Sequence, residues 1–229
     1  MDQPNDDFAS QQPADAFVKE RHWMVEHQLR SRGIADPRVL QAMLEVPREK
    51  FVPANLVPAA HQDAAQPIGH EQTISQPFTV AYMVEAARLT GGEKVLEIGT
   101  GSGYGAAVLS RVARQVYSVE RIEELADVAK ARLAGLGYDN VTVVVGDGSR
   151  GLAEHQPYDA IIVTAAASEL PTAYQEQLVD GGRIVIPLGN QYYGQTMYRY
   201  TRHGDRWDID NLGGFAFVPL ISAQDEPHD

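Results

Sequence analysis

The sequence predicts an α/β protein with a mostly parallel central sheet, a helical N-terminal region and an antiparallel C-terminal edge. Three observations support this fold class. Strand-like and helix-like runs alternate between Lys94 and Leu188, which is typical of a parallel sheet covered by helices. The first strand-like run leads into the glycine-rich loop Gly99–Gly105. Beyond Gly194 the helical runs stop and strand-like segments follow one another, which indicates antiparallel strands at the sheet edge.

The chain is expected to form one domain, because 229 residues can bury one substantial core. Residues 1–16 carry four aspartates, no basic residue and little apolar content, so we expect a disordered acidic tail there. Residues 17–223 would form the domain, divided into a helical, substrate-facing region at 17–92 and a cofactor-binding core at 93–223. Residues 224–229 would form a short acidic end.

The N-terminal region is expected to be helical. Helical spacing runs from Val18 to Arg32. A second helix begins where Asp36 can act as the N-cap and Pro37 occupies the first helical position, and it would stop before Pro47. The stretch Phe51–Pro77 is rich in proline and lacks periodicity, so we expect a loop there.

From Pro77 onward, the expected elements follow the alternation described above. The predicted strands are Lys94–Ile98, Gln115–Val119, Val141–Val145, Tyr158–Val163, Arg183–Leu188, Thr196–Tyr200, Trp207–Ile209 and Phe215–Val218. The predicted helices are Pro77–Leu89, one starting at Tyr104, Ile122–Leu136 and Pro171–Leu178. The loops after parallel strands meet at one edge of the sheet, where ligands of such folds bind.

The glycine-rich loop is typical of a nucleotide-cofactor site. Its glycines let the backbone approach a ligand, and the helix that follows offers unpaired N–H groups. The segment Gly101–Ala106 fits the dinucleotide pattern G-x-G-x-x-G/A, and Glu120 follows Gly101 at the spacing of an acid that binds ribose hydroxyls. NAD and S-adenosylmethionine fit this pattern equally well.

Glu97 favours S-adenosylmethionine over NAD. A nicotinamide enzyme usually keeps an apolar residue at this strand end, whereas a carboxylate can face the positively charged amino-acid end of S-adenosylmethionine. The triplet Gly146-Asp147-Gly148 alone is more often an ordinary turn, but its position brings Asp147 to the same sheet edge, where it can reach an adenine amino group. We therefore predict a class I S-adenosylmethionine-dependent methyltransferase, a Rossmann-like architecture, with S-adenosylhomocysteine as its product.

Composition limits the remaining function classes. The net charge of −12 disfavours binding to nucleic acid and to anionic membranes. The chain has no cysteine, and its seven histidines lack the spacing of metal ligands, so no metal site is expected. It contains neither a membrane-length apolar run nor an N-terminal signal pattern, which favours a cytoplasmic location. We expect a monomer.

Several segments resemble the protein-L-isoaspartate O-methyltransferase family, and the resemblance covers residues 24–221. The matching stretches are Met24–Arg48, Glu71–Pro77, Val95–Tyr104, Val119–Arg121, Gly146–Gly148, Tyr158–Ala166 and Phe217–Leu220. The hexapeptide QTISQP at residues 72–77, combined with FVPL at residues 217–220, is the most specific part. Two positions differ from the common family pattern and affect the floor of the pocket, namely Glu71 and the pair Gly105-Ala106.

The resemblance implies methyl transfer from S-adenosylmethionine to the α-carboxyl of L-isoaspartyl residues in damaged proteins and peptides, which starts repair through a succinimide. By the family pattern, the catalytic residue is Ser75. The implied cofactor-binding residues are Thr73, Ile74, Glu97, Gly99, Gly101, Gly103, Glu120, Asp147 and Gly148. The implied substrate-binding residues are Ser75, Gln76, Thr164, Ala165, Val218, Pro219 and Leu220.

The proposed chemistry needs few catalytic groups. A carboxylate is already ionised at neutral pH, so no general base is required and positioning carries most of the catalysis. Ser75 would donate a hydrogen bond to the acceptor carboxylate. Its structural alternative is the N-cap of the helix that begins at Pro77, and the two roles are compatible.

Two other functions are consistent with parts of the sequence. One is a carboxyl methyltransferase of the same fold that acts on a dedicated peptide or a small-molecule carboxylate. The other is a nicotinamide-dependent oxidoreductase, which would need a motif such as Tyr-x-x-x-Lys. The tyrosine pair Tyr192-Tyr193 has no lysine after it, and no lysine follows Lys130.

Overall fold

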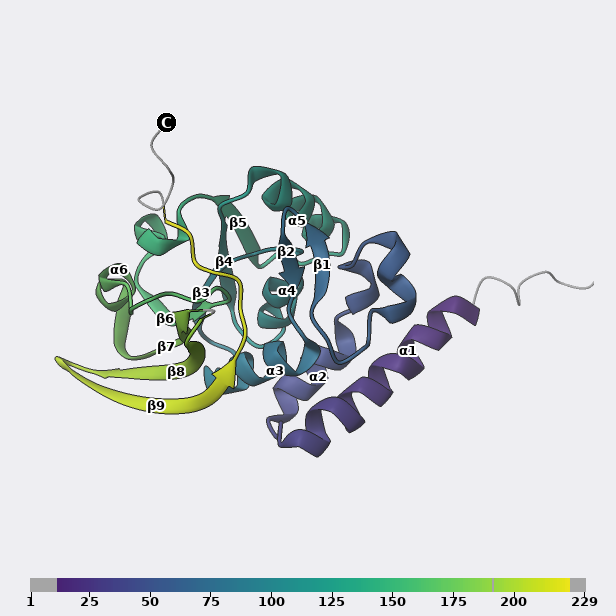
Figure 1. The fold of residues 1–229 in the computed structure, drawn as a ribbon, viewed down its shortest axis with the longest axis horizontal. Coiled ribbons are helices and arrows are strands. Elements are labelled where there is room, and N and C mark those ends of the chain that lie inside the picture. The colour runs from purple at the N-terminus through teal and green to yellow at the C-terminus, as the bar shows by residue number, and fades with distance from the viewer. Residues whose placement is uncertain (1–11, 191, 223–229) are drawn as a thin grey trace, which may run out of the picture.

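The computed structural model describes residues 12–190 and 192–222, and its central feature is a seven-stranded sheet (Figure 1). Its strands are β3 (Lys94–Ile98), β4 (Gln115–Glu120), β5 (Val141–Val145), β6 (Tyr158–Val163), β7 (Leu178–Asn190), β8 (Gly194–His203) and β9 (Arg206–Phe215). A separate hairpin contains β1 (Gln66–Gly69) and β2 (Gln72–Ile74). The α-helices are α1 (Gln12–Met24), α2 (Pro37–Glu45), α3 (Pro77–Ala86), α4 (Tyr104–Ser110), α5 (Glu123–Gly135) and α6 (Thr172–Glu176).

The strand order of the large sheet is β5-β4-β3-β6-β7-β8-β9. The first five strands in this order are parallel, whereas β8 is antiparallel to β7 and β9 is antiparallel to β8. The prediction of a mostly parallel sheet with an antiparallel C-terminal edge is confirmed. Chain order runs outward in opposite directions from β3 and β6, so a crevice is expected beyond the carboxyl ends of these two strands.

The N-terminal helical region begins earlier than predicted. Helix α1 starts at Gln12, inside the segment expected to be a disordered tail, and Pro13 is compatible with the first turn of a helix. A π-helical turn at Val25–Leu29 and a 3-10 turn at Arg30–Arg32 extend this helical segment. Residues 1–11 and 223–229 lie outside the described residues, so the tail predictions remain predictions there.

Helix α2 has the predicted start. Asp36 is its N-cap, its Oδ1 accepts a hydrogen bond of 2.8 Å from the backbone N–H of Arg38, and Pro37 occupies the first turn. The interaction with Arg38 holds the pKa of Asp36 below its usual value, although partial burial acts in the opposite direction. The apolar positions Val39, Leu40 and Met43 are buried, which packs this helix against the body of the protein.

The predicted loop between residues 51 and 77 is wrong in part, because residues 66–69 and 72–74 form the β1–β2 hairpin and residues 54–59 form a 3-10 helix. The hairpin turn uses His70 and Glu71 at φ angles of 51° and 58°, in the left-handed region where glycine or asparagine is the usual signal. Without that signal at these two positions, the sequence pattern did not predict a hairpin.

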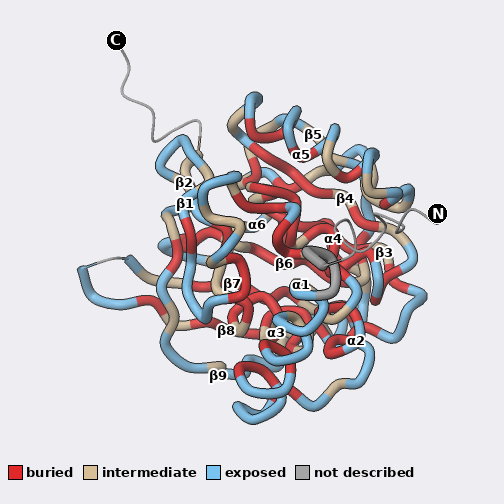
Figure 2. The backbone as a smooth tube through the Cα atoms, turned by 90° about the vertical axis from the view of Figure 1, so that its right-hand side faces the viewer, coloured by how far each residue is buried: buried red, intermediate tan, exposed pale blue. Residues whose placement is uncertain are grey.

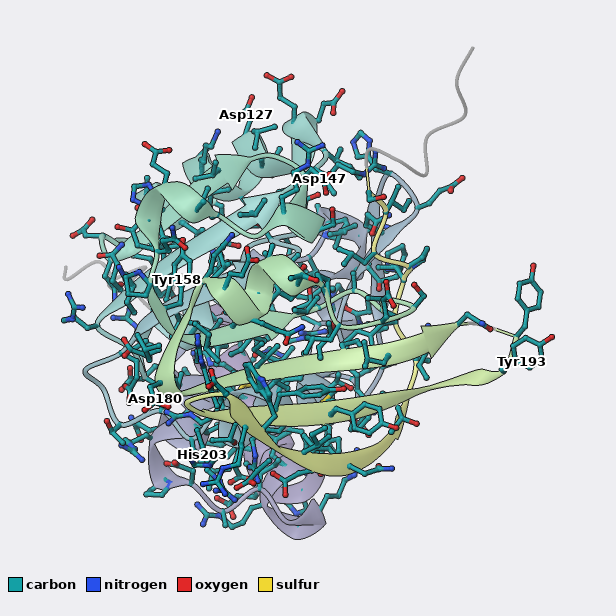
Figure 3. The ribbon with its side chains drawn as sticks, turned by 90° about the vertical axis from the view of Figure 1, so that its left-hand side faces the viewer. Asp127, Asp147, Tyr158, Asp180, Tyr193 and His203 are labelled. Carbon is teal, nitrogen blue, oxygen red and sulfur yellow. The ribbon has the colours of Figure 1, made fainter. Side chains whose placement is uncertain are left out.

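Two buried clusters lie on opposite faces of the sheet. The larger cluster packs α2, α3, α4 and the N-terminal turns against one face, and the smaller cluster includes Ile98, Tyr158 and Tyr174 on the other. Figure 2 shows the buried backbone concentrated in the central strands. Figure 3 shows the β7–β8 hairpin projecting from the body with Tyr193 at its tip. None of the helices in the part of the chain that the structure describes has the length and apolar content needed to cross a bilayer.

We expect Glu71→Gly to raise the free energy of unfolding by about 0.5–1 kcal/mol, because glycine removes the left-handed backbone strain at φ 58°. Urea denaturation of the purified variant measures this. The matched control is Glu124→Gly in the first turn of α5, an exposed glutamate in a regular helix, which should lower stability by a similar amount. Equal destabilisation by the two substitutions would contradict the assigned backbone conformation at Glu71.

Candidate active site

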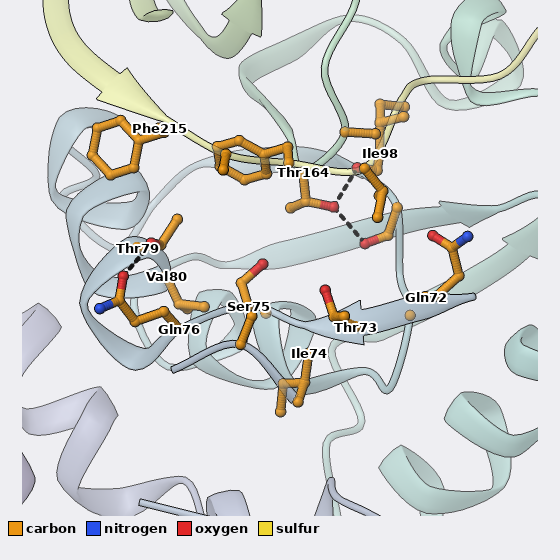
Figure 4. Close-up of a pocket in the computed structure, with 18 of the residues that line it drawn as sticks. Gln72, Thr73, Ile74, Ser75, Gln76, Thr79, Val80, Ile98, Thr164 and Phe215 are labelled. Atoms are coloured by element: carbon orange, nitrogen blue, oxygen red, sulfur yellow. Dashed lines mark hydrogen bonds between the residues drawn. The ribbon is translucent and has the colours of Figure 1, made fainter. Parts of the chain in front are cut away.

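A cavity of about 920 Å³ lies at the carboxyl ends of β3, β4 and β6. The segment 216–221, which we term the crossing segment, forms one of its walls, and the β2–α3 junction forms another. Figure 4 shows the side chains that meet there. The predicted site residues on its lining are Thr73, Ile74, Ser75, Gln76, Glu97, Gly99, Gly101, Glu120, Gly148, Thr164, Ala165, Val218, Pro219 and Leu220.

The glycine loop packs closely against the end of β6. Gly99 has a φ of 95°, and a Cβ atom there would lie 2.3 Å from the Thr164 hydroxyl oxygen. This hydroxyl lies 2.9 Å from the carbonyl oxygens of Ile98 and Gly99, which accept its hydrogen bond (Figure 4). The contact joins the two neighbouring strand ends and leaves room only for glycine at position 99.

Glu97 carries a buried carboxyl group beside the cavity. Its side chain is 1% exposed, and its Oε2 accepts a hydrogen bond of 2.5 Å from the Ser118 hydroxyl, which lies 2.6 Å from the Thr100 hydroxyl. Burial raises the pKa of Glu97 to about 8, and the nearby charge of Glu120 acts in the same direction. At neutral pH this carboxyl is therefore mostly protonated, although a cation placed beside it would favour the carboxylate.

Gly105 makes room for the carboxyl group of Glu97. A Cβ atom at position 105 would lie 2.3 Å from Glu97 Oε1. A side chain at position 105 would require the carboxyl group of Glu97 to shift. The other departure, Glu71, is exposed in the hairpin turn and does not line the cavity.

Glu120 connects the loops that follow β3 and β4. Its Oε2 accepts a hydrogen bond of 2.8 Å from the Gly101 N–H, and its Oε1 accepts one of 3.0 Å from the Ile122 N–H. The residue is 7% exposed and lies on the cavity wall. Each carboxylate oxygen has further acceptor capacity, so Glu120 can also accept hydrogen bonds from the hydroxyls of a ligand.

Two predicted cofactor residues do not line the cavity. Gly103 is the N-cap of α4, with a φ of 87°. Asp147 directs its Oδ1 to the backbone N–H and the hydroxyl of Ser149, at 2.9 Å and 2.6 Å. Its neighbour Gly148 does line the cavity, and a Cβ atom there would lie 2.5 Å from Ile98 Cγ2.

Ser75 lies between β2 and α3, and its side chain points toward the strand end that carries Thr164 (Figure 4). The alternative prediction for Ser75, the N-cap of α3, is wrong. Gln76 is the N-cap, and no side chain caps this helix. The Gln76 amide instead accepts a hydrogen bond of 3.1 Å from the Thr79 hydroxyl and donates one of 3.2 Å to the Asp63 carbonyl. The Ser75 hydroxyl is therefore not used for capping.

The crossing segment is held by hydrogen bonds on both sides. The buried Gln195 amide donates to the Phe217 carbonyl at 3.0 Å and accepts from the Phe217 N–H at 2.6 Å. On the opposite side, the Ala166 N–H donates to the Val218 carbonyl at 2.8 Å, and the Leu220 N–H donates to the Ala166 carbonyl at 2.7 Å. The predicted strand Phe215–Val218 is therefore wrong, because β9 ends at Phe215 and the following residues bond to separate partners.

The sequence interpretation missed one wall of the cavity. Phe78, Phe215 and Phe217 line this wall, and together with Tyr82 behind it they form a row in which neighbouring ring centroids lie 5.4–6.4 Å apart. The guanidinium of Arg32 stacks 3.7 Å above the Phe78 ring and pairs with Asp63 at 2.7 Å. Arg32 and Phe217 lie in stretches that the sequence analysis names, but the residues of this wall come from distant parts of the chain and only the fold brings them together. Within the described residues, no group of three or more acidic or histidine side chains is placed to hold a metal ion.

A model of the family described as protein-L-isoaspartate(D-aspartate) O-methyltransferase (PCMT) matches residues 19–225. The chain belongs to this family. It is 53% identical to protein-L-isoaspartate O-methyltransferase 2 of Pelobacter propionicus, over 89% of this chain and 91% of the relative. It is 57% identical to protein-L-isoaspartate O-methyltransferase of a Synechococcus strain, over 92% of this chain and 90% of the relative.

Two solved structures of the protein-L-isoaspartate O-methyltransferase family have the same fold. One gives a TM-score of 0.78 at 31% identity; the match covers 88% of this chain and 65% of that longer chain. The other is from Plasmodium falciparum and holds S-adenosyl-L-homocysteine. It gives a TM-score of 0.74 at 27% identity, over 86% of this chain and 96% of that one. The predicted class I methyltransferase fold is confirmed.

We expect Gly105→Ala to lower the free energy of unfolding by about 1–3 kcal/mol, because the new methyl group overlaps the buried carboxyl group of Glu97. Thermal and urea denaturation measure this. Gly135→Ala is the control, because a Cβ atom at the end of α5 has open space around it and alanine favours the helix. If Gly105→Ala were as stable as Gly135→Ala, the close contact with Glu97 would be refuted.

Proposed function

We propose that this protein transfers a methyl group from S-adenosylmethionine to the α-carboxyl of L-isoaspartyl residues in damaged proteins and peptides. The ester then closes to a succinimide, which initiates repair. The observation that carries the proposal is one cavity in which a glycine loop with buried acids faces Ser75. Membership of the protein-L-isoaspartate O-methyltransferase family supports the same reaction.

The residues of the glycine loop fit S-adenosylmethionine. Positions 99 and 101 have left-handed backbone that brings the chain close to a ligand, and the carboxyl of Glu97 beside them suits an ammonium group. Glu120 would accept hydrogen bonds from the ribose hydroxyls. Gly148 would border the adenine. When bound, S-adenosylmethionine supplies a methyl group activated by a sulfonium centre.

The chain's own residues position the acceptor and exclude water. The acceptor carboxylate is ionised at neutral pH, so the protein need not remove a proton from it. Ser75 would donate a hydrogen bond to one carboxylate oxygen and so orient the other for attack. Thr164 and Ala165, together with Val218, Pro219 and Leu220 of the crossing segment, would border the acceptor and limit access of water. Thr73, Ile74 and Gln76 would complete the junction around Ser75.

The roles of Gly103 and Asp147 follow from their positions. Gly103 would act through the backbone by allowing α4 to begin where it does. Asp147 would bind the adenine amino group only through Oδ2, because its Oδ1 is engaged by Ser149; Oδ2 lies 3.5 Å from Arg150 Nε. We therefore expect a smaller loss of cofactor affinity from Asp147→Ala than from Glu120→Ala.

The location, partners and oligomeric state of the protein are also proposed. We propose that the protein acts in the cytoplasm on isoaspartyl-containing polypeptides. Its charge of −12 disfavours association with nucleic acid and with anionic membranes. A monomer is sufficient for this function, because all the proposed site residues come from one chain.

We expect labelled methyl to transfer to a synthetic peptide that contains isoaspartate and not to the same peptide with aspartate. Ser75→Ala should lower kcat by about tenfold, because one hydrogen bond to a charged acceptor is lost, while the cofactor Kd stays within about twofold. Ser110→Ala, which removes a serine hydroxyl outside the cavity lining, is the control. Cofactor binding without transfer to either peptide would instead favour the dedicated peptide or small-molecule carboxylate as acceptor.

We expect cofactor binding at pH 6–7 to release a fraction of a proton. Glu97 is mostly protonated in the free protein because its pKa is about 8, and the ammonium group of the cofactor, which is already charged at this pH, favours the carboxylate. Affinity should therefore increase as the pH rises toward 8. Calorimetry in buffers of different ionisation enthalpy measures the released proton.

The Glu97→Gln variant distinguishes proton release by Glu97 from proton release by other titrating groups. The variant should bind the cofactor about tenfold or more weakly and should show no release of a proton from position 97. If proton release were the same in the variant and in the unmodified protein, Glu97 would not be the group that faces the ammonium.

A further inference from the structure

Arg48 is fully buried beneath the β2–α3 junction. It lies in the 3-10 turn Arg48–Lys50, and its side chain has no exposed surface. The Nε donates a hydrogen bond of 2.8 Å to the Ala60 carbonyl, and the Nη2 donates one of 2.9 Å to the Ser75 carbonyl. The guanidinium carbon lies 4.8 Å from the ring centroid of Tyr104. Arg48 therefore contacts the backbone of Ser75 and the ring of Tyr104, the first residue of α4.

The cost of burying Arg48 is not offset by an ion pair. Among the described residues no carboxylate pairs with Arg48, whereas the adjacent Glu49 pairs with Arg21 at 2.7 Å. The Nη1 atom of Arg48 is buried and has no hydrogen-bond partner in the described part of the chain. Tyr104 stays neutral, because burial raises its pKa to about 12. A buried, unpaired cation is expensive, so stability alone does not explain an arginine here.

Arg48 contacts residues from both sides of the cavity, Ser75 and Tyr104. Ser75 lies on the substrate side, outside the regular backbone of β2 and α3. Tyr104 begins α4 on the cofactor side and lines the same cavity. A rigid guanidinium that bonds to one and stacks on the other fixes their separation. Its positive charge behind Ser75 also favours an anion in front of Ser75.

We propose that Arg48 is a positioning residue for methyl transfer: it fixes the Ser75 backbone relative to the glycine loop and favours the binding of the acceptor carboxylate. The inference rests on the proposed function. Arg48 itself does not line the cavity and touches no reacting group. Its effect is therefore expected on the acceptor side, in kcat and in peptide affinity, with little effect on cofactor affinity.

The test compares Arg48→Lys with Arg199→Lys. Lysine keeps the charge but cannot reach both carbonyls and stack on Tyr104. Arg199 is a matched control, because it is 8% exposed and donates a hydrogen bond to the Ala86 carbonyl, but lies outside the cavity lining. We expect Arg48→Lys to lower kcat/KM for the isoaspartyl peptide by about tenfold or more, with cofactor Kd within about twofold. Arg199→Lys should leave both unchanged.

Two further measurements separate positioning from general destabilisation. Calorimetric titration of the isoaspartyl peptide, with S-adenosylhomocysteine present, should show weaker peptide binding only in Arg48→Lys. In Arg48→Ala, millimolar guanidinium ion should restore part of the lost kcat, as expected for a vacated guanidinium site. Melting temperatures of all variants identify any that are unfolded at the assay temperature.

Three results would overturn the inference: unchanged kcat/KM and peptide affinity in folded Arg48→Lys, an equal loss of cofactor affinity, or an equal loss in Arg199→Lys. Failure of the proposed function gives a different result. In that case the unmodified protein would transfer no methyl group to the isoaspartyl peptide and would not bind it, and the role of Arg48 would be rejected with it.

Discussion

The site depends on one constraint, the burial of the Glu97 carboxyl group at the end of the central strand β3. An ionisable group with 1% exposure must be hydrogen-bonded and must have space, and the neighbouring residues supply both. Ser118 on β4 donates the hydrogen bond, and Gly105 on α4 leaves the space. One residue on each of two neighbouring elements therefore accommodates this side chain. The same burial makes the carboxyl responsive to a cation, because it is close to losing its proton at neutral pH.

A second set of contacts places the crossing segment and the β2–α3 junction against the glycine loop. Thr164 joins the ends of β3 and β6, Gln195 and Ala166 hold the crossing segment, and Arg48 lies beneath Ser75. Each contact involves backbone carbonyl or N–H groups of the residues that face the cavity. The geometry of the site is thus set by backbone positions, which suits a reaction that depends on orientation more than on proton transfer.

The sequence predicted the strands of the central sheet well, but it predicted the irregular segments of the cavity wall poorly. The bounds of β3, β5 and β6 agree residue for residue with the prediction, because each strand is a largely apolar run; β3 and β6 are buried, whereas the edge strand β5 is partly exposed. Strand β7 is longer than predicted. The pair Gly181-Gly182 inside it is typical of a turn, so the predicted strand began only at Arg183. Motifs that are contiguous in sequence led to most of the cavity residues. Arg32, Asp63 and Phe215 were missed because only the tertiary fold brings them together.

Asp147 shows why a residue pattern underdetermines a role. The GDG triplet is at the predicted sheet edge, yet Gly148 faces the cavity and Asp147 does not. A carboxylate that accepts two hydrogen bonds from Ser149 stabilises the turn that presents Gly148. Its other oxygen lies 3.5 Å from Arg150 Nε. Sequence spacing predicts the edge of the sheet reached by a side chain, whereas the direction of each oxygen depends on the local turn.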